Sequence, residues 1–134
     1  MKLNQETIIQ EVRVRIRAKV NLTEDQSRVE RSIINIVSGK PTIRVTEDNY
    51  ILVEGDLSLL SSIRNRIVKN EQEELLCNIL EKNREDSLLT FFINKQSALN
   101  NNLHLIDESM SSLGDIEVEI YTDNQDYVFD WFTS

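Results

Sequence analysis

The stretch that decides the fold is "EVRVRIRAKV", residues 11–20, in which apolar and basic residues alternate strictly. Alternation with a period of two is typical of a β-strand with one buried and one solvated side. The sequence therefore predicts a strand over roughly residues 9–20. The buried side would hold Val12, Val14, Ile16, Ala18 and Val20, and the solvated side would hold Arg13, Arg15, Arg17 and Lys19.

A second stretch, "GDIEVEIYT" at residues 114–122, alternates in the same way and carries the opposite charge. If it lies beside the first strand, Glu117 and Glu119 would face the arginines as cross-strand pairs. Exposed pairs of this kind contribute only ~0.2–1 kcal/mol each, but they cancel the potential that attracts a phosphate. The sequence leaves both interpretations open: a charge-paired sheet surface, or a surface that binds anions such as RNA.

The chain between these two strands mixes helical and strand patterns. "NLTEDQSRVERSIINIVSG" predicts a helix capped by Thr23 and stopped by Gly39. "PTIRVTEDNYILVEG" predicts a hairpin with its turn at residues 47–49. Asp56 is expected to cap a further helix, and Asn70 one that follows a break at "KNEQEE".

The C-terminal third is expected to be rich in strands. "SLLTFFIN" and "NLHLI" are predicted strands, and "DYVFDWF" is predicted to be a strand or an extended segment. In an extended tail, Tyr127, Phe129 and Trp131 would share one side and pack in the core or against a subunit. We therefore predict one α+β domain over residues 1–134, a mostly antiparallel sheet with helices packed on one face.

Composition narrows the class of protein. A chain of 134 residues with 40% hydrophobic and 28% charged residues is typical of a single globular domain. Its only cysteine, Cys77, excludes an internal disulfide and a cysteine-rich zinc site. The chain has no stretch of eighteen apolar residues and begins without a signal-like apolar segment. We expect a soluble cytoplasmic protein with no membrane partner.

The charge is unevenly distributed. The net charge of −8 argues against general nucleic-acid binding. However, residues 1–45 hold nine Lys/Arg and five Asp/Glu, whereas residues 46–134 hold six and eighteen. This asymmetry permits a local basic surface on an acidic body, and it also permits pairing between two copies.

A second basic group lies further along the chain. Arg64, Arg66 and Lys69 fall in a predicted helix, and Lys95 and Gln96 open the polar segment 94–102. Arg64 and Arg66 are two residues apart and so point in different directions on a helix. The alternative to a binding role is that these side chains are ordinary solvent-exposed residues on the surface of a helix.

Catalytic signatures are absent from the sequence. It contains no GxxxxGK[ST], GxGxxG, GxSxG or HExxH motif. His104 is the only histidine, and the carboxylates of "DNQDYVFD" lack the glycine and spacing of a calcium loop. We therefore expect no enzyme, no catalytic residues, no cofactor and no metal.

The order of segments near the C-terminus resembles a family of small uncharacterised archaeal proteins, often described as predicted RNA-binding or exosome-associated. An apolar strand ends in Asn94-Lys95-Gln96, and a polar loop and a short strand follow. Leu113-Gly114 then precedes an alternating strand, and Asp130-Trp131 closes the segment. Upstream, the basic strand, the Thr-Glu-Asp helix start and "VEGDLSLLSSIRNRI" are also similar, so the resemblance covers nearly the whole chain.

This resemblance implies a fold similar to the ribosomal large-subunit protein that carries 5S rRNA, and a homodimer. By analogy of fold it implies binding to structured RNA such as rRNA or tRNA, or a ribonucleoprotein accessory role. The residues predicted to bind RNA are Arg13, Arg15, Arg17, Lys19, Arg64, Arg66, Lys95 and Gln96.

The alternative is a protein–protein adaptor whose acidic C-terminal half binds a basic partner. A third hypothesis is an enzyme with an unrecognised carboxylate site. RNA binding predicts that the basic strand is open to solvent, and an adaptor predicts that Glu117 and Glu119 mask it. An enzyme would need a concave pocket that gathers carboxylates from different segments.

Overall fold

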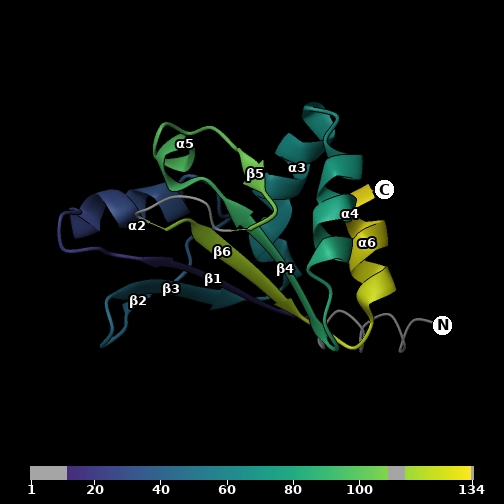
Figure 1. Ribbon diagram of the computed structural model, residues 1–134, viewed down its shortest axis with the longest axis horizontal. Helices are drawn as coiled ribbons and strands as arrows, with labels where there is room; N and C mark the ends of the chain where they lie inside the picture. Colours follow the sequence, from purple (N-terminus) through teal and green to yellow (C-terminus); the bar gives the residue numbers. More distant parts are fainter. Residues whose placement is uncertain (1–11, 109–113, 134) are drawn as a thin grey trace.

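The computed structural model describes residues 12–108 and 114–133 (Figure 1). In chain order its elements are β1 (Arg13–Lys19), α2 (Gln26–Ile34), β2 (Ile43–Val45), β3 (Tyr50–Gly55), a 3-10 helix (Leu57–Leu60), α3 (Ser61–Lys69), α4 (Glu73–Lys82), β4 (Leu88–Ile93), α5 (Lys95–Leu99), β5 (Leu105–Ile106), β6 (Ile116–Tyr121) and α6 (Gln125–Thr133). The first predicted strand is confirmed over β1; its residues 9–11, and Leu113 of the family pattern, lie outside the described residues.

The described strands form one antiparallel sheet in the order β2-β3-β1-β6-β4-β5. β1 lies near the middle, between β3 and β6, so the strand with alternating cations pairs directly with the strand with alternating carboxylates. The predicted hairpin is confirmed as β2–β3, and Asn49 takes the left-handed conformation (φ 64°) that its turn needs. The predicted α+β class with an antiparallel sheet is therefore confirmed.

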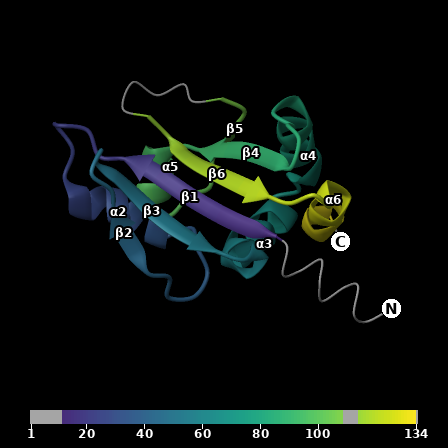
Figure 2. The same cartoon turned by 90° about the horizontal axis from the view of Figure 1, so that it is seen from below.

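The helices lie on one side of the sheet. Figure 2 views the sheet from below, with α2 and α5 behind it and with α4 and α6 at the end where β1 starts and β6 finishes. The side chains of the sheet that face the helices are buried: Val14, Ile16 and Ala18 of β1 are at most 2% exposed. They form one core cluster with apolar residues of α2, α3, α4 and α6. Of the described helices, none lies on the opposite side of the sheet.

Two helix boundaries differ from the prediction. Asp25, not Thr23, caps α2: its side chain accepts a 3.0 Å hydrogen bond from the backbone N–H of Ser27. The helix ends at Ile34, and Gly39 takes a left-handed conformation (φ 76°) in the loop beyond. The predicted cap at Asn70 is also wrong, because Gln72 precedes α4 and the chain first turns through Glu71 (φ 55°). The cap at Asp56 is confirmed by its bond from Ser58 N–H.

The tail is a helix, α6, and not the predicted strand. Val128 and Phe132, four residues apart, are fully buried, as one face of a helix requires. The Asn124 side chain accepts a hydrogen bond from the N–H of Tyr127 at 3.3 Å, which satisfies a donor of the first turn. Alternating aromatics are typical of strands, but here burial against Phe91 of β4 decides the conformation.

Candidate nucleic-acid interface

The side of the sheet without helices is the candidate site, and we call it the open face (Figure 2). Its members follow from the strand registers, because residues directly opposite in neighbouring strands point to the same side. They are Arg44 of β2; Tyr50, Leu52 and Glu54 of β3; Arg13, Arg15, Arg17 and Lys19 of β1; Glu117, Glu119 and Tyr121 of β6; and Leu88, Thr90 and Phe92 of β4.

The centre of the open face is a double row of paired charges, the Arg–Glu ladder. Arg15 lies opposite Glu119, with Nε 3.0 Å from Oε1, and Arg17 lies opposite Glu117 and donates through Nε to Oε1. The hydrogen bond to Glu119 raises the pKa of Arg15 above its ordinary value, although burial opposes this. The cross-strand pairs expected from the sequence are therefore present.

The ladder leaves its arginines outermost. The side chains of Arg15 and Arg17 are 37% and 36% exposed, whereas those of Glu119 and Glu117 are 10% and 22% exposed. Among the described residues, each arginine donates through Nε alone, so the Nη groups of both remain available. A guanidinium has five N–H donors in a planar fork that fits phosphate oxygens. The ladder thus compensates charge and still offers oriented donors to solvent.

Two tyrosines flank the ladder and hold it in place. The Arg15 guanidinium carbon lies 5.9 Å from the ring centre of Tyr121, and that of Arg17 lies 5.2 Å from the ring centre of Tyr50. These are cation–π distances, which limit the rotation of each arginine. The tyrosines, and Phe92 on β4, were not predicted as site residues. The alternation in "NYILVEG" and "IEVEIY" predicts that Tyr50 and Tyr121 lie on strands, but only the structure shows that these strands are neighbours of β1.

The two ends of β1 carry exposed cations, Arg13 and Lys19. Within the described residues, no carboxylate lies within 4.0 Å of either charge. The strand residues of the open face include five Lys/Arg and the three carboxylates Glu54, Glu117 and Glu119, a balance of +2 on a chain of net charge −8. One further carboxylate, Asp48 of the β2–β3 turn, lies at the edge of this face near Arg17 and Lys19. It is thus a locally basic surface on an acidic body.

The second predicted basic group does not join this surface. Arg66 points to the loops around α5, where its Nη2 donates to the carbonyl of Asn35 at 2.7 Å and to Oδ1 of Asn101 at 2.8 Å. Arg64 stacks on Trp131 of α6, with 5.0 Å between the guanidinium carbon and the ring centre. Both side chains connect helices and loops to each other, so the structure gives them packing roles.

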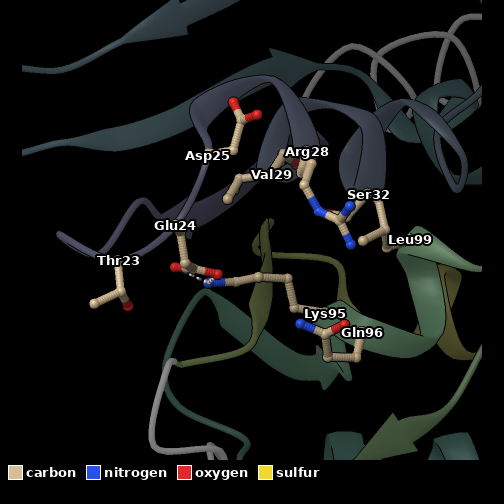
Figure 3. A pocket seen from close by; sticks show the side chains of 9 residues that line it. All are labelled: Thr23, Glu24, Asp25, Arg28, Val29, Ser32, Lys95, Gln96 and Leu99. Carbon is tan, nitrogen blue, oxygen red and sulfur yellow. Dashed lines mark hydrogen bonds and ion pairs between the residues drawn. The ribbon is translucent and has the colours of Figure 1, made fainter.

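Lys95 is buried, with 5% of the residue exposed (Figure 3). Its Nζ donates to the carbonyl of Lys19 at 2.8 Å and lies 3.1 and 3.2 Å from the two carboxylate oxygens of Glu24. Burial opposes ionisation of Glu24, but hydrogen bonds from Asn21 and from Lys95 outweigh it and lower the pKa of this carboxyl. This geometry gives Lys95 a structural role, and its phosphate contact stays a prediction.

The Lys95–Glu24 pair lies at a hollow of about 260 Å³ between α2 and α5 (Figure 3). Gln96 is exposed and lines it together with Arg28. The pair joins the Thr-Glu-Asp helix start to the Asn-Lys-Gln segment, two parts of the family pattern that are seventy-one positions apart. The sequence did not reveal this contact, because neither segment shows that its charge is buried.

Two other kinds of site have no counterpart among the described residues. Residues 12–108 and 114–133 contain no group of three or more His, Cys, Asp or Glu side chains placed to hold a metal ion. In the same residues, none of the helices has the length and apolar character needed to cross a membrane.

Comparisons with known proteins place the chain in a family. A family model described as RNA binding matches residues 13–122, from the start of β1 to one residue beyond β6. The chain belongs to this family. A UPF0201 protein of Methanothermobacter thermautotrophicus is 34% identical over 120 residues, 89% of each chain. The resemblance to a family of small archaeal proteins is thereby confirmed.

Solved structures of UPF0201 proteins share the fold. One crystal structure superposes with a TM-score of 0.74 at 22% identity and covers 88% of this chain and 90% of that chain. The UPF0201 protein from Methanococcus jannaschii superposes with a TM-score of 0.69 at 23% identity, over 90% and 91% of the two chains. The likeness to the ribosomal protein that carries 5S rRNA, and the homodimer, stay predictions.

Proposed function

We propose that this protein binds the backbone of structured RNA, such as rRNA or tRNA, through the open face, and that it acts as a binding protein and not as an enzyme. Arg13 and Lys19 supply cationic charge that attracts phosphates, and no carboxylate of the described residues forms an ion pair with either of them. Arg15 and Arg17 supply oriented Nη donors that position the backbone. The observation that carries the proposal is the local balance of +2 on an uncovered sheet surface.

Family membership supports the same proposal. The matched residues, 13–122, include β1, β2, β3 and β6. These four strands carry all the charged residues of the open face. The adaptor alternative needs Glu117 and Glu119 to mask the arginines, but both glutamates lie deeper in the surface than their partners. The open face is charge-compensated at its centre and remains open to a phosphate chain.

The test is fluorescence anisotropy with labelled tRNA and 5S rRNA between about 50 and 200 mM salt. The variant Arg13→Gln/Lys19→Gln removes the two cations at the ends of β1. We expect the slope of log K against log salt to change from about −1.4 to near zero, at ~0.7 per phosphate contact. The matched control, Arg31→Gln/Lys40→Gln, removes two exposed cations outside the open face and should leave the slope unchanged.

Two results would contradict the proposal. The first is no RNA binding by the wild-type protein at the lowest salt concentration, which would direct attention to a basic protein partner. The second is an equal loss of affinity in both double variants, which would mean that total charge and not the open face controls binding.

A further inference from the structure

Two hollows flank the Arg–Glu ladder on the open face. The β3 hollow has a volume of about 100 Å³ and is lined by Tyr50, Leu52, Thr46 and the carboxylate Asp48 beside the two arginines. The β4 hollow has a volume of about 410 Å³. Leu88, Thr90 and Phe92 line it beside the two glutamates, and its outer wall is polar, formed by Lys82, Asn83, Arg84 and Glu85. Each hollow therefore combines an aromatic ring and an aliphatic side chain with one edge of the ladder.

The hollows lie on a single line across the sheet. Leu52, Arg17, Glu117 and Phe92 are direct neighbours on successive strands β3, β1, β6 and β4. Three strand spacings of ~4.8 Å separate the two ends of this row by about 14 Å. A ligand that fills both hollows must cross the arginines of the ladder between them.

The chemistry of this row fits an unpaired nucleic-acid segment. Aromatic rings on a sheet stack on bases that are free of a duplex, and Arg planes can also stack on bases or contact the phosphates between them. In an A-form duplex the bases are stacked on each other and their faces are not accessible. A duplex could therefore contact the ends of β1 but could not place bases in either hollow.

We propose that the open face selects single-stranded RNA, such as a loop or an end of a structured RNA, and seats one base in the β3 hollow at Tyr50 and another in the β4 hollow at Phe92. The backbone between these bases crosses the outward Nη groups of Arg15 and Arg17. This inference rests on the proposed RNA-binding function and adds the class of RNA that the same surface takes.

The test compares a labelled single-stranded RNA with a blunt duplex of the same sequence. We expect the single strand to bind at least about tenfold more tightly, and Phe92→Leu and Tyr50→Leu each to lower its affinity by about tenfold, the loss typical of one base–aromatic stack. Leucine keeps apolar bulk in each hollow and removes the ring face. Affinity for the duplex should not change in Phe92→Leu, since Phe92 makes no contact with the arginines of the ladder.

The control is Tyr127→Leu, which makes the same kind of substitution on α6, where Tyr127 packs against the core. A fluorescent purine analogue in the single strand should be quenched by the wild-type protein and not by Phe92→Leu. Equal affinity for single strand and duplex, or unchanged binding by both aromatic variants, would overturn the inference while the proposed function stands. Absence of binding to either RNA would instead overturn the proposed function.

Discussion

At the scale of single residues, the most consequential interaction is the buried ion pair of Lys95 and Glu24. Their side chains are only 6% and 10% exposed, and Lys95 also donates to a backbone carbonyl of β1. Breaking such a pair from one side leaves an uncompensated buried charge, which costs more than the pair itself contributes. The pair therefore fixes the loop before α2 against the start of α5.

Replacing Glu24 with Gln should lower the free energy of unfolding by about 3 kcal/mol, since Lys95 keeps its charge in a buried position. The double variant Glu24→Leu/Lys95→Met, which removes both charges, should recover a large part of this loss. Urea denaturation measures both effects. The control Lys82→Met breaks the pair between Lys82 and Asp107, two exposed side chains, and should cost clearly less than Glu24→Gln.

The same pair makes stability depend on pH. Because the folded protein lowers the pKa of Glu24, its carboxylate stabilises the fold at pH values above the unfolded pKa of about 4.3. This contribution is lost as the pH falls through the lower folded pKa. The difference in unfolding free energy between wild type and Glu24→Gln should thus shrink as the solution is acidified below about pH 4. A constant difference would mean that Glu24 does not act through its charge.

At the scale of elements, the tail shows how burial overrides a sequence pattern. As a strand, the tail would bury Tyr127, Phe129 and Trp131 together; as the helix α6, it buries Val128 and Phe132. Phe132 is fully buried and meets Phe91 edge to face, with ring centres 6.2 Å apart. The extended tail would therefore pack Phe129 into the core, whereas the helix buries Phe132 and leaves Phe129 only partly buried.

Phe132→Ala should lower the free energy of unfolding by about 3–5 kcal/mol, because it removes a large side chain from the core. Phe129→Ala, at a half-buried position beside Arg84, should cost clearly less. Chemical denaturation of the two variants decides between helix and strand. A larger loss for Phe129→Ala would support the extended tail that the alternation of aromatics suggested.

The comparison of β1 with α6 explains how far the sequence could predict the fold. In β1 the alternation of charge and apolar residues agrees with burial, so the strand and its two sides were predictable. Pairing with β6 was one of two interpretations that the sequence left open, and the strand register decides it. In α6 the aromatics have strand propensity, and only the buried Phe91 beneath them reveals a helix. The same contrast holds for the candidate site. The alternation predicted that Arg15 and Arg17 lie on the solvated side of a strand, whereas the burial of Lys95 depends on Glu24, which is distant in sequence.

At the scale of the whole molecule, function depends on a small basic surface within a large acidic field. The open face carries +2, so the rest of the chain carries −10. An acidic body repels nucleic acid at long range, and salt screens this repulsion beyond about 8–10 Å. The proposed RNA contact should therefore depend on charges on the open face itself more than on the total charge.

The variant Glu117→Gln/Glu119→Gln tests this dependence, because it frees the charges of Arg15 and Arg17 and keeps hydrogen-bonding side chains opposite them. RNA affinity should rise, and the slope of log K against log salt should steepen from about −1.4 to about −2.8 as four cations replace two. Glu73→Gln/Glu74→Gln changes the net charge equally, but on α4, away from the open face, and should leave the slope near −1.4 by the same relation. Anisotropy titrations with single-stranded RNA measure both slopes. If both double variants steepened the slope equally, the compensated ladder would not be the contact surface, and the acidic body as a whole would control the interaction with RNA.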